Sequence, residues 1–171
     1  MLSNSEILSV LEMLRNEHLD LRTVTLGISL LDCASDDIKR FTDKVYDRIV
    51  TKAERLVALC HLAEEKYGIP VVNKRVSVSP IAVVAAPFTS DQMVAVAQTL
   101  DRAANTVQVD FIGGFSALVE KGIATGDRAL IDALPQALST TQRVCASINV
   151  ASTRAGINMD AILLMGRQIK A

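Results

Sequence analysis

Hydrophobic and polar positions follow two different periods along the chain, one typical of strands and one of helices. Four segments rich in Val, Ile and Thr predict strands: 19–29, 69–79, 107–114 and 143–152. Three others carry apolar residues every three or four positions, which predicts amphipathic helices: 38–67, 89–104 and 157–171. Because helices separate the strands, we expect an α/β fold with a mainly parallel sheet and outer helices.

Capping signals place the ends of the helices. Ser3 and Glu6 have the spacing of a capping box, so a first helix should run to about Glu17. The acidic "SDD" at 35–37 precedes a single apolar stripe that continues to Gly68. A helix of that length would measure roughly 50 Å and needs a larger body against it.

The stretch "GGFSALVEKG" at 113–122 places two glycines after an apolar run. We expect the strand to end there, with a helical turn beginning at Ser116 whose amides hold a carboxylate or phosphate. In the alternative interpretation, Gly113 and Gly114 only permit a tight strand-to-helix turn with Ser116 as its cap. After it, Asp127 is expected to cap a short helix that Pro135 interrupts or kinks.

Ligands of α/β proteins bind beyond the carboxyl ends of the strands, so the polar residues that follow each apolar run are the candidates for a binding site. These ligand-binding candidates, expected at one end of the sheet, are Cys33, Asn73, Lys74, Arg75, Gly113, Gly114, Ser116, Asn149, Ser152, Thr153 and Arg154.

Each group of candidates also has a structural explanation. Lys74 and Arg75 face either water or an anion, because two adjacent cations inside an apolar strand are costly to bury. The segment 149–158 is rich in side-chain donors, yet it also fits a plain loop with local caps. Cys33 follows Asp32, whose charge should raise the pKa of the thiol. Cys60 and Cys145 fit buried, inert thiols.

Composition narrows the class of protein. With 171 residues, of which 50% are hydrophobic, the chain has the length of one core-rich domain. No signal-peptide pattern or long apolar run is present, so we expect a cytoplasmic protein without a membrane partner. The net charge of −1 and 4% aromatic content do not favour nucleic-acid binding. The three cysteines have neither disulfide nor zinc spacing, so we expect free thiols and no metal site.

Four stretches carry a resemblance to a known family: "RTVTLGISLLDC", "GIPVVNKRVSVSPI", "VDFIGGFSALVEKG" and "VCASINVASTRAGINM". Together they resemble a bacterial and archaeal family known as domain of unknown function 711, or uncharacterised protein family 0210. It is also called the pyruvate formate-lyase-like family. The resemblance implies the ten-stranded α/β barrel of pyruvate formate-lyase and ribonucleotide reductase, two half-barrels of five parallel strands each.

The resemblance also implies that residues 1–171 are a single α/β domain, an amino-terminal part of a larger barrel with roughly its first half. The absence of a capping residue after Ile169 fits this expectation. No catalytic residue is carried over. An enzyme that binds a small anionic metabolite and a non-catalytic binding or assembly protein without radical chemistry both remain open. Because half a barrel would expose an inner face rich in Val, Ile and Phe, we expect a homo-oligomer.

Overall fold

The structure is a computed structural model that describes residues 3–16 and 20–171. Its strands are β1 (Leu21–Ile28), β2 (Val71–Val78), β3 (Phe111–Leu118), β4 (Val144–Asn149), β5 (Ala151–Ser152) and β6 (Gly156–Ile157). Its helices are α1 (Asn4–Arg15), the 3-10 turn η1 (Leu31–Cys33), α2 (Ile38–Ala53), α3 (Leu56–Tyr67), α4 (Ile81–Val84), α5 (Ser90–Thr106), α6 (Thr125–Ser139) and α7 (Met159–Lys170).

The main sheet is parallel, in the order β1-β2-β3-β4, which confirms the predicted α/β class. It has four strands in the described part of the chain, one fewer than the resemblance implies for half a barrel. A small antiparallel pair, β5 with β6, follows β4. The sequence pattern did not predict this pair, because each strand is only two residues long.

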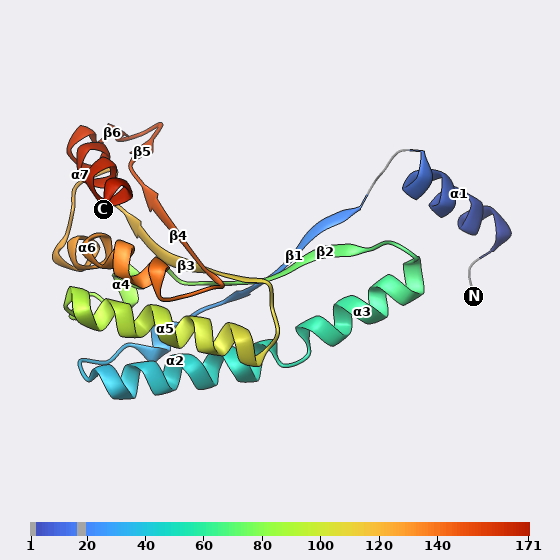
Figure 1. Ribbon diagram of the computed structural model, residues 1–171, viewed down its shortest axis with the longest axis horizontal. Helices are drawn as coiled ribbons and strands as arrows, with labels where there is room; N and C mark the ends of the chain where they lie inside the picture. Colours follow the sequence, from blue (N-terminus) through green and yellow to red (C-terminus); the bar gives the residue numbers. More distant parts are fainter. Residues whose placement is uncertain (1–2, 17–19) are drawn as a thin grey trace.

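Helices cover one face of the sheet (Figure 1). Phe41, Val45 and Ile49 of α2 are fully buried there, and α2 packs on α5, which packs on α6. The strands contribute their own apolar side chains to the same core, including Ile112 and Phe115. The expectation that the face rich in Val, Ile and Phe is uncovered is therefore wrong, since this is the face that the helices cover.

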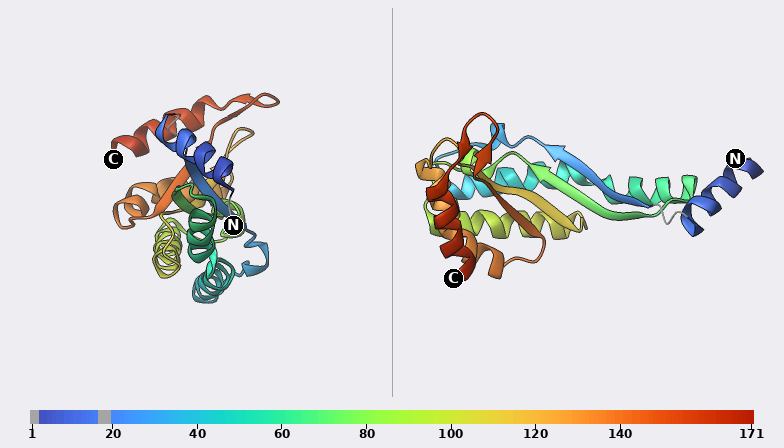
Figure 2. Two further views of the ribbon diagram at one scale, coloured as in Figure 1. Left: turned by 90° about the vertical axis from the view of Figure 1, so that its right-hand side faces the viewer. Right: turned by 90° about the horizontal axis from the view of Figure 1, so that it is seen from above.

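The molecule is elongated, because β1 and β2 run on beyond the ends of β3 and β4 (Figures 1 and 2). The arm consists of this two-stranded extension together with α3, which packs on β2, and α1 at its tip. The capping box that opens α1 is confirmed, with the Glu6 carboxylate accepting from the Ser3 amide at 2.6 Å. Glu17, where the helix was expected to end, and Leu19 lie outside the described residues.

The single long helix predicted from 38 to 67 is wrong, because α2 ends at Ala53 and α3 begins at Leu56. Between them, the backbone of Arg55 departs from ideal α-helical angles, with φ −99° and ψ −3°. The break lets α2 pack on α5 while α3 follows β2 along the arm. Buried residues continue on both sides of it, which is why the hydrophobic pattern does not reveal it. The predicted end is confirmed at Gly68, which has φ +68°.

Two predictions around β3 and α6 also need correction. The strand predicted at 107–114 begins at Phe111 and continues to Leu118, so the helical turn expected after Ser116 does not exist. Asp127 does stabilise the start of α6, where its carboxylate accepts from the Ala124 amide at 2.9 Å. Pro135 lies inside α6 and does not end it, and the helix runs for 15 residues.

Candidate functional site on the uncovered face of the sheet

The other face of the sheet carries small and polar side chains. Burial alternates strictly along β4, where Cys145, Ser147 and Asn149 are exposed and the residues between them are half-buried. Residues that pair across adjacent strands of a parallel sheet point to the same side of it. The register therefore places one row across all four strands, which consists of Gly27, Ser77, Gly113 and Cys145. We call this set the central row.

The rows on either side of the central row are also polar or open. Thr25, Arg75 and Phe111 pair on the side nearer the arm, and Ser116 pairs with Ser147 on the other side. An added Cβ at Gly27 or Gly113 would meet nothing within 4 Å, so the space above these glycines is open. The uncovered face thus has a floor of small residues, which leaves room for a ligand.

A β-bulge explains the pair of glycines in β3. The register between β3 and β4 shifts between Gly113 and Phe115, and Gly114 takes φ +115°. An added Cβ at Gly114 would stand 2.5 Å from Val78 Cγ2 and 2.6 Å from the Val78 carbonyl oxygen. Glycine is therefore required for both its backbone angle and the close approach of β2. The extra residue of the bulge shifts the alternation of β3 by one position, so that Phe115 enters the core as Ile112 does.

The two adjacent cations of β2 point to different environments. Lys74 lies on the side of α3, where its Nζ is 3.7 Å from Glu64 Oε1 and donates to the Val71 carbonyl at 2.9 Å. Arg75 is exposed on the uncovered face, with its guanidinium 5.3 Å from the centroid of the Phe111 ring. Within the described residues, Arg75 forms no ion pair. Of the two, Arg75 has its charge free for a ligand.

The Glu64 carboxylate does more than pair with Lys74. It accepts from the backbone amide of Val71 at 2.7 Å and lies 2.8 Å from His61 Nδ1. These hydrogen bonds, the one from Val71 first, hold the pKa of Glu64 below its ordinary value. Lys74 therefore belongs to a polar cluster that attaches α3 to the start of β2.

The remaining sequence candidates do not gather around Arg75. Asn73 lies further along the arm and donates to the Arg22 carbonyl. Asn149, the last residue of β4, pairs with Leu118 of β3. Leu118 is seven residues along β3 from Phe111, the partner of Arg75, so Asn149 and Arg75 are about 20 Å apart along the strands. The expectation that the candidates lie together at one end of the sheet is therefore wrong. Most lie within strands of the main sheet, and Asn149 is the candidate that ends one of those strands.

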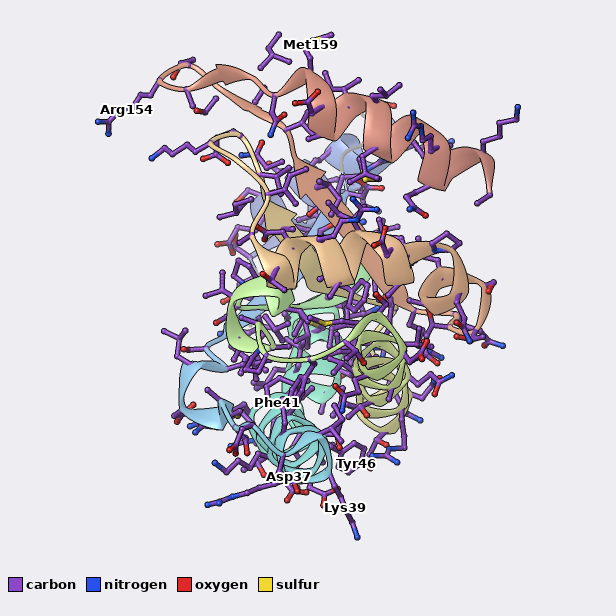
Figure 3. The ribbon with its side chains drawn as sticks, turned by 90° about the vertical axis from the view of Figure 1, so that its left-hand side faces the viewer. Asp37, Lys39, Phe41, Tyr46, Arg154 and Met159 are labelled. Atoms are coloured by element: carbon purple, nitrogen blue, oxygen red, sulfur yellow. The ribbon has the colours of Figure 1, made fainter. Side chains whose placement is uncertain are left out.

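Ser152 ends β5, and the next two candidates, Thr153 and Arg154, lie in the turn that leads to β6. The Ser152 hydroxyl accepts from the Ala155 amide at 3.1 Å, which is the local cap that the structural interpretation of this segment expected. Figure 3 shows Arg154 at the tip of the turn, pointing away from the sheet. Thr153 is exposed beside it. These side chains do not contribute to the central row.

The three cysteines are free thiols, as predicted, but their exposure differs from the prediction. Cys60 is buried as expected. Cys145 is exposed, because the half-buried residues of β4 are those on either side of it. Cys33 is 2% exposed behind the helices, and its Sγ lies 3.7 Å from the Lys44 carbonyl oxygen. Burial, and next to it the charge of Asp32, raise the pKa of the Cys33 thiol.

Sequence reasoning missed several residues of the uncovered face: Thr25, Gly27, Ser77 and Cys145. The signal was present in the alternation of "VSVS" and "CASIN", which is the period-two pattern of a sheet with one polar face. Among the described residues, no three His, Cys, Asp or Glu side chains are grouped so as to hold a metal ion. None of the described helices is both long and apolar enough to cross a membrane.

Comparison with known proteins identifies relatives along the whole chain. The model of the family described as Uncharacterised ACR (DUF711) matches residues 12–171. A UPF0210 protein of Oleidesulfovibrio alaskensis is 66% identical over 169 residues, which cover 99% of this chain and 37% of that protein. A UPF0210 protein of Methanosarcina barkeri is 54% identical over 165 residues, 96% of this chain and 36% of the relative. The chain thus spans little more than a third of the length of these relatives.

Proposed function

The chain belongs to the Uncharacterised ACR (DUF711) family, and on that premise we propose that its sheet forms one wall of a barrel whose interior binds a small anionic metabolite. The ten-stranded barrel implied by the resemblance is part of this proposal. What the structure contributes is a four-stranded parallel sheet with the helices α2, α5 and α6 packed on one face. Parallel sheets are ordinarily covered on both faces, so the bare face requires an explanation.

The chemistry of the bare face favours a ligand cavity over contact with another apolar layer. A face that packs against a second layer is lined with large aliphatic side chains, as the helix-covered face is here. The central row instead offers two glycines, a serine and a cysteine. Small residues leave volume, and hydroxyl groups supply donors that fix the orientation of a polar ligand.

Arg75 carries the proposal of an anionic ligand. Its planar guanidinium matches a carboxylate or phosphate in two parallel hydrogen bonds. Stacking on Phe111 holds the guanidinium in place, with no carboxylate of the described residues to neutralise it. Thr25 and Ser77 provide hydroxyl groups beside it, the first at the same level of the sheet and the second two residues along β2. A short carboxylate or phosphate ester fits this set.

The geometry favours binding over catalysis by Cys33. A reactive thiol of low pKa that faces the cavity of Lys74 and Arg75 would have supported an enzyme. Cys33 is instead buried on the helix side, where its pKa is raised. We therefore propose the non-catalytic alternative, a metabolite-binding barrel, and assign no catalytic residue.

Calorimetric titration with acetate, pyruvate, succinate and inorganic phosphate tests the proposal, on this chain and on a longer family member. Arg75→Gln should weaken binding of the best anion roughly 10- to 100-fold, the usual effect of losing a charged hydrogen-bonding pair. Arg154→Gln is the matched control, because it removes a cation from the β5–β6 turn and should leave affinity unchanged. The absence of binding in both proteins, or a loss with Arg154→Gln alone, would overturn the proposal.

A further inference from the structure

A cavity of about 430 Å³ lies where the break between α2 and α3 meets the carboxyl-terminal end of α5. Figure 1 shows the end of α5 beside this break. The residues that line the cavity come from all three helices, among them Val50 of α2, Ala58 of α3 and Val107 at the end of α5. We call it the junction cavity. Its volume is within the range of small-molecule sites.

One part of the junction cavity is apolar. Val50 and Val57 are half-buried and pack against the hydrophobic core, and Val107 is 8% exposed. Ala58 is exposed beside them on α3, and its small side chain leaves space. These side chains offer a short aliphatic chain a surface on which it can leave water.

The polar groups of the junction cavity are mostly hydrogen-bond acceptors. The Glu54 carboxylate can only accept. His61 Nδ1 lies 2.8 Å from the Glu64 carboxylate, so this nitrogen must donate, and Nε2 of the neutral ring is left as an acceptor. The Thr106 hydroxyl already donates its hydrogen to the Arg102 carbonyl at 3.0 Å, which leaves its oxygen to accept.

The charge at the junction cavity has one sign. Glu54 forms no ion pair within the described part of the chain. The helix α5 ends here after 17 residues, which places the negative end of its dipole at the cavity. The described residues that line the cavity include no lysine or arginine. An anion is therefore repelled here, and a cation is attracted.

From these groups we propose that the junction cavity binds a short aliphatic primary amine in its protonated form. An ammonium group has three donors and no acceptor, which matches acceptors supplied by Glu54, His61 and the end of α5. The aliphatic chain of the amine lies on Val50 and Val57. The proposal does not depend on the anionic ligand of the uncovered face, because the two sites share no residue.

A nuclear magnetic resonance titration of the isotopically labelled chain with hexylamine tests the proposal, at about pH 8, where aliphatic amines are protonated. The amide resonances of Ala58, Val107 and Gln108 should shift, with a Kd of about 1 mM or lower. Hexanoate and hexanol carry the same aliphatic chain without the cation. Each should bind at least about 10-fold more weakly than hexylamine.

Two variants separate the charge of the cavity from its space. Glu54→Gln should weaken hexylamine binding roughly 10-fold or more, because it removes the charged partner of the ammonium group. Glu65→Gln is the matched control and should leave the affinity unchanged, since Glu65 is an exposed acid of α3 that does not line the cavity. Ala58→Phe keeps Glu54 but fills the cavity, and should abolish binding.

Four results would overturn the proposal. The first is the absence of shifts in these resonances with hexylamine up to about 10 mM. The second is binding of hexanoate or hexanol as tight as that of hexylamine. The third is an unchanged affinity in Glu54→Gln, and the fourth is a set of shifts confined to residues outside the cavity. The comparison of the three ligands uses the parent chain, so it decides the question even if Ala58→Phe does not fold.

Discussion

Replacement of Gly114 by alanine is the sharpest test of how β3 is built. The residue lies in the bulge at φ +115°, a region that side-chain-bearing residues rarely adopt. The new Cβ would stand 2.5 Å from Val78 Cγ2 and 2.6 Å from the Val78 carbonyl oxygen, far inside van der Waals contact. Val78 is itself buried under the helices, so its side chain has little room to move.

Two costs add to give the expected loss of stability. Backbone strain at such an angle costs about 1–3 kcal/mol. Displacing the backbone and side chain of Val78 is an overpacking cost of about 1–3 kcal/mol. Against them stands the lower chain entropy of unfolded alanine, worth about 0.5–1 kcal/mol. We therefore expect Gly114→Ala to lose about 3 kcal/mol, a large share of the roughly 5–15 kcal/mol of an ordinary domain.

Denaturant unfolding measured by circular dichroism gives the free energy directly. Gly113→Ala is the matched control, because the adjacent residue lacks a positive φ and an added Cβ there meets nothing within 4 Å. It should leave stability unchanged or raise it by up to about 1 kcal/mol, as alanine does in a strand. If the two variants differ by less than about 0.5 kcal/mol at equal m-values, the bulge does not require glycine and the argument is refuted.

Two further predictions concern titrating groups. In the folded chain only Cys145 should react within a brief iodoacetamide pulse, because Cys33 and Cys60 are buried and burial raises the pKa of both thiols. Mass spectrometry showing a second modified cysteine before unfolding would contradict this. The pKa of Glu64 is depressed by the hydrogen bond from Val71, so its stabilisation is present above the ordinary pKa of 4.5 and is lost as the pH falls through the folded value. In the Glu64→Gln variant, the free energy of unfolding should therefore fall less steeply as the pH is lowered into the acid range. The same pH dependence in both proteins would exclude this role for Glu64.

The fold class follows from the sequence because strands and helices alternate in a clear order. The failures lie where a local signal has two meanings. The glycine pair at 113 and 114 indicates a strand end when considered alone, whereas the structure uses it as a bulge inside β3. The stripe from Phe41 to Cys60 is continuous in sequence, yet Arg55 breaks the helix because its two halves pack on different partners. Tertiary packing decided both cases.

The candidate site was predictable only in part. Arg75, Gly113 and Ser116 were chosen from the sequence, and the register places them on or beside the central row. They were chosen for following strand ends, however, and each lies inside a strand. The sequence could not show which of Lys74 and Arg75 is on the bare face, because a register shift of one residue would exchange the faces that they occupy.

The composition of the central row supports the proposed ligand site over an incidental bare surface. A face that simply met water would have no reason to avoid large polar side chains, and lysine or glutamate would suit it well. In this sheet the register aligns glycine, serine, glycine and cysteine across all four strands, and places an arginine without an ion pair in the described chain at one side. A row of small residues leaves space above the sheet, and the adjacent Arg75 supplies a positive charge. Volume and charge at one place are what a compact anionic ligand requires.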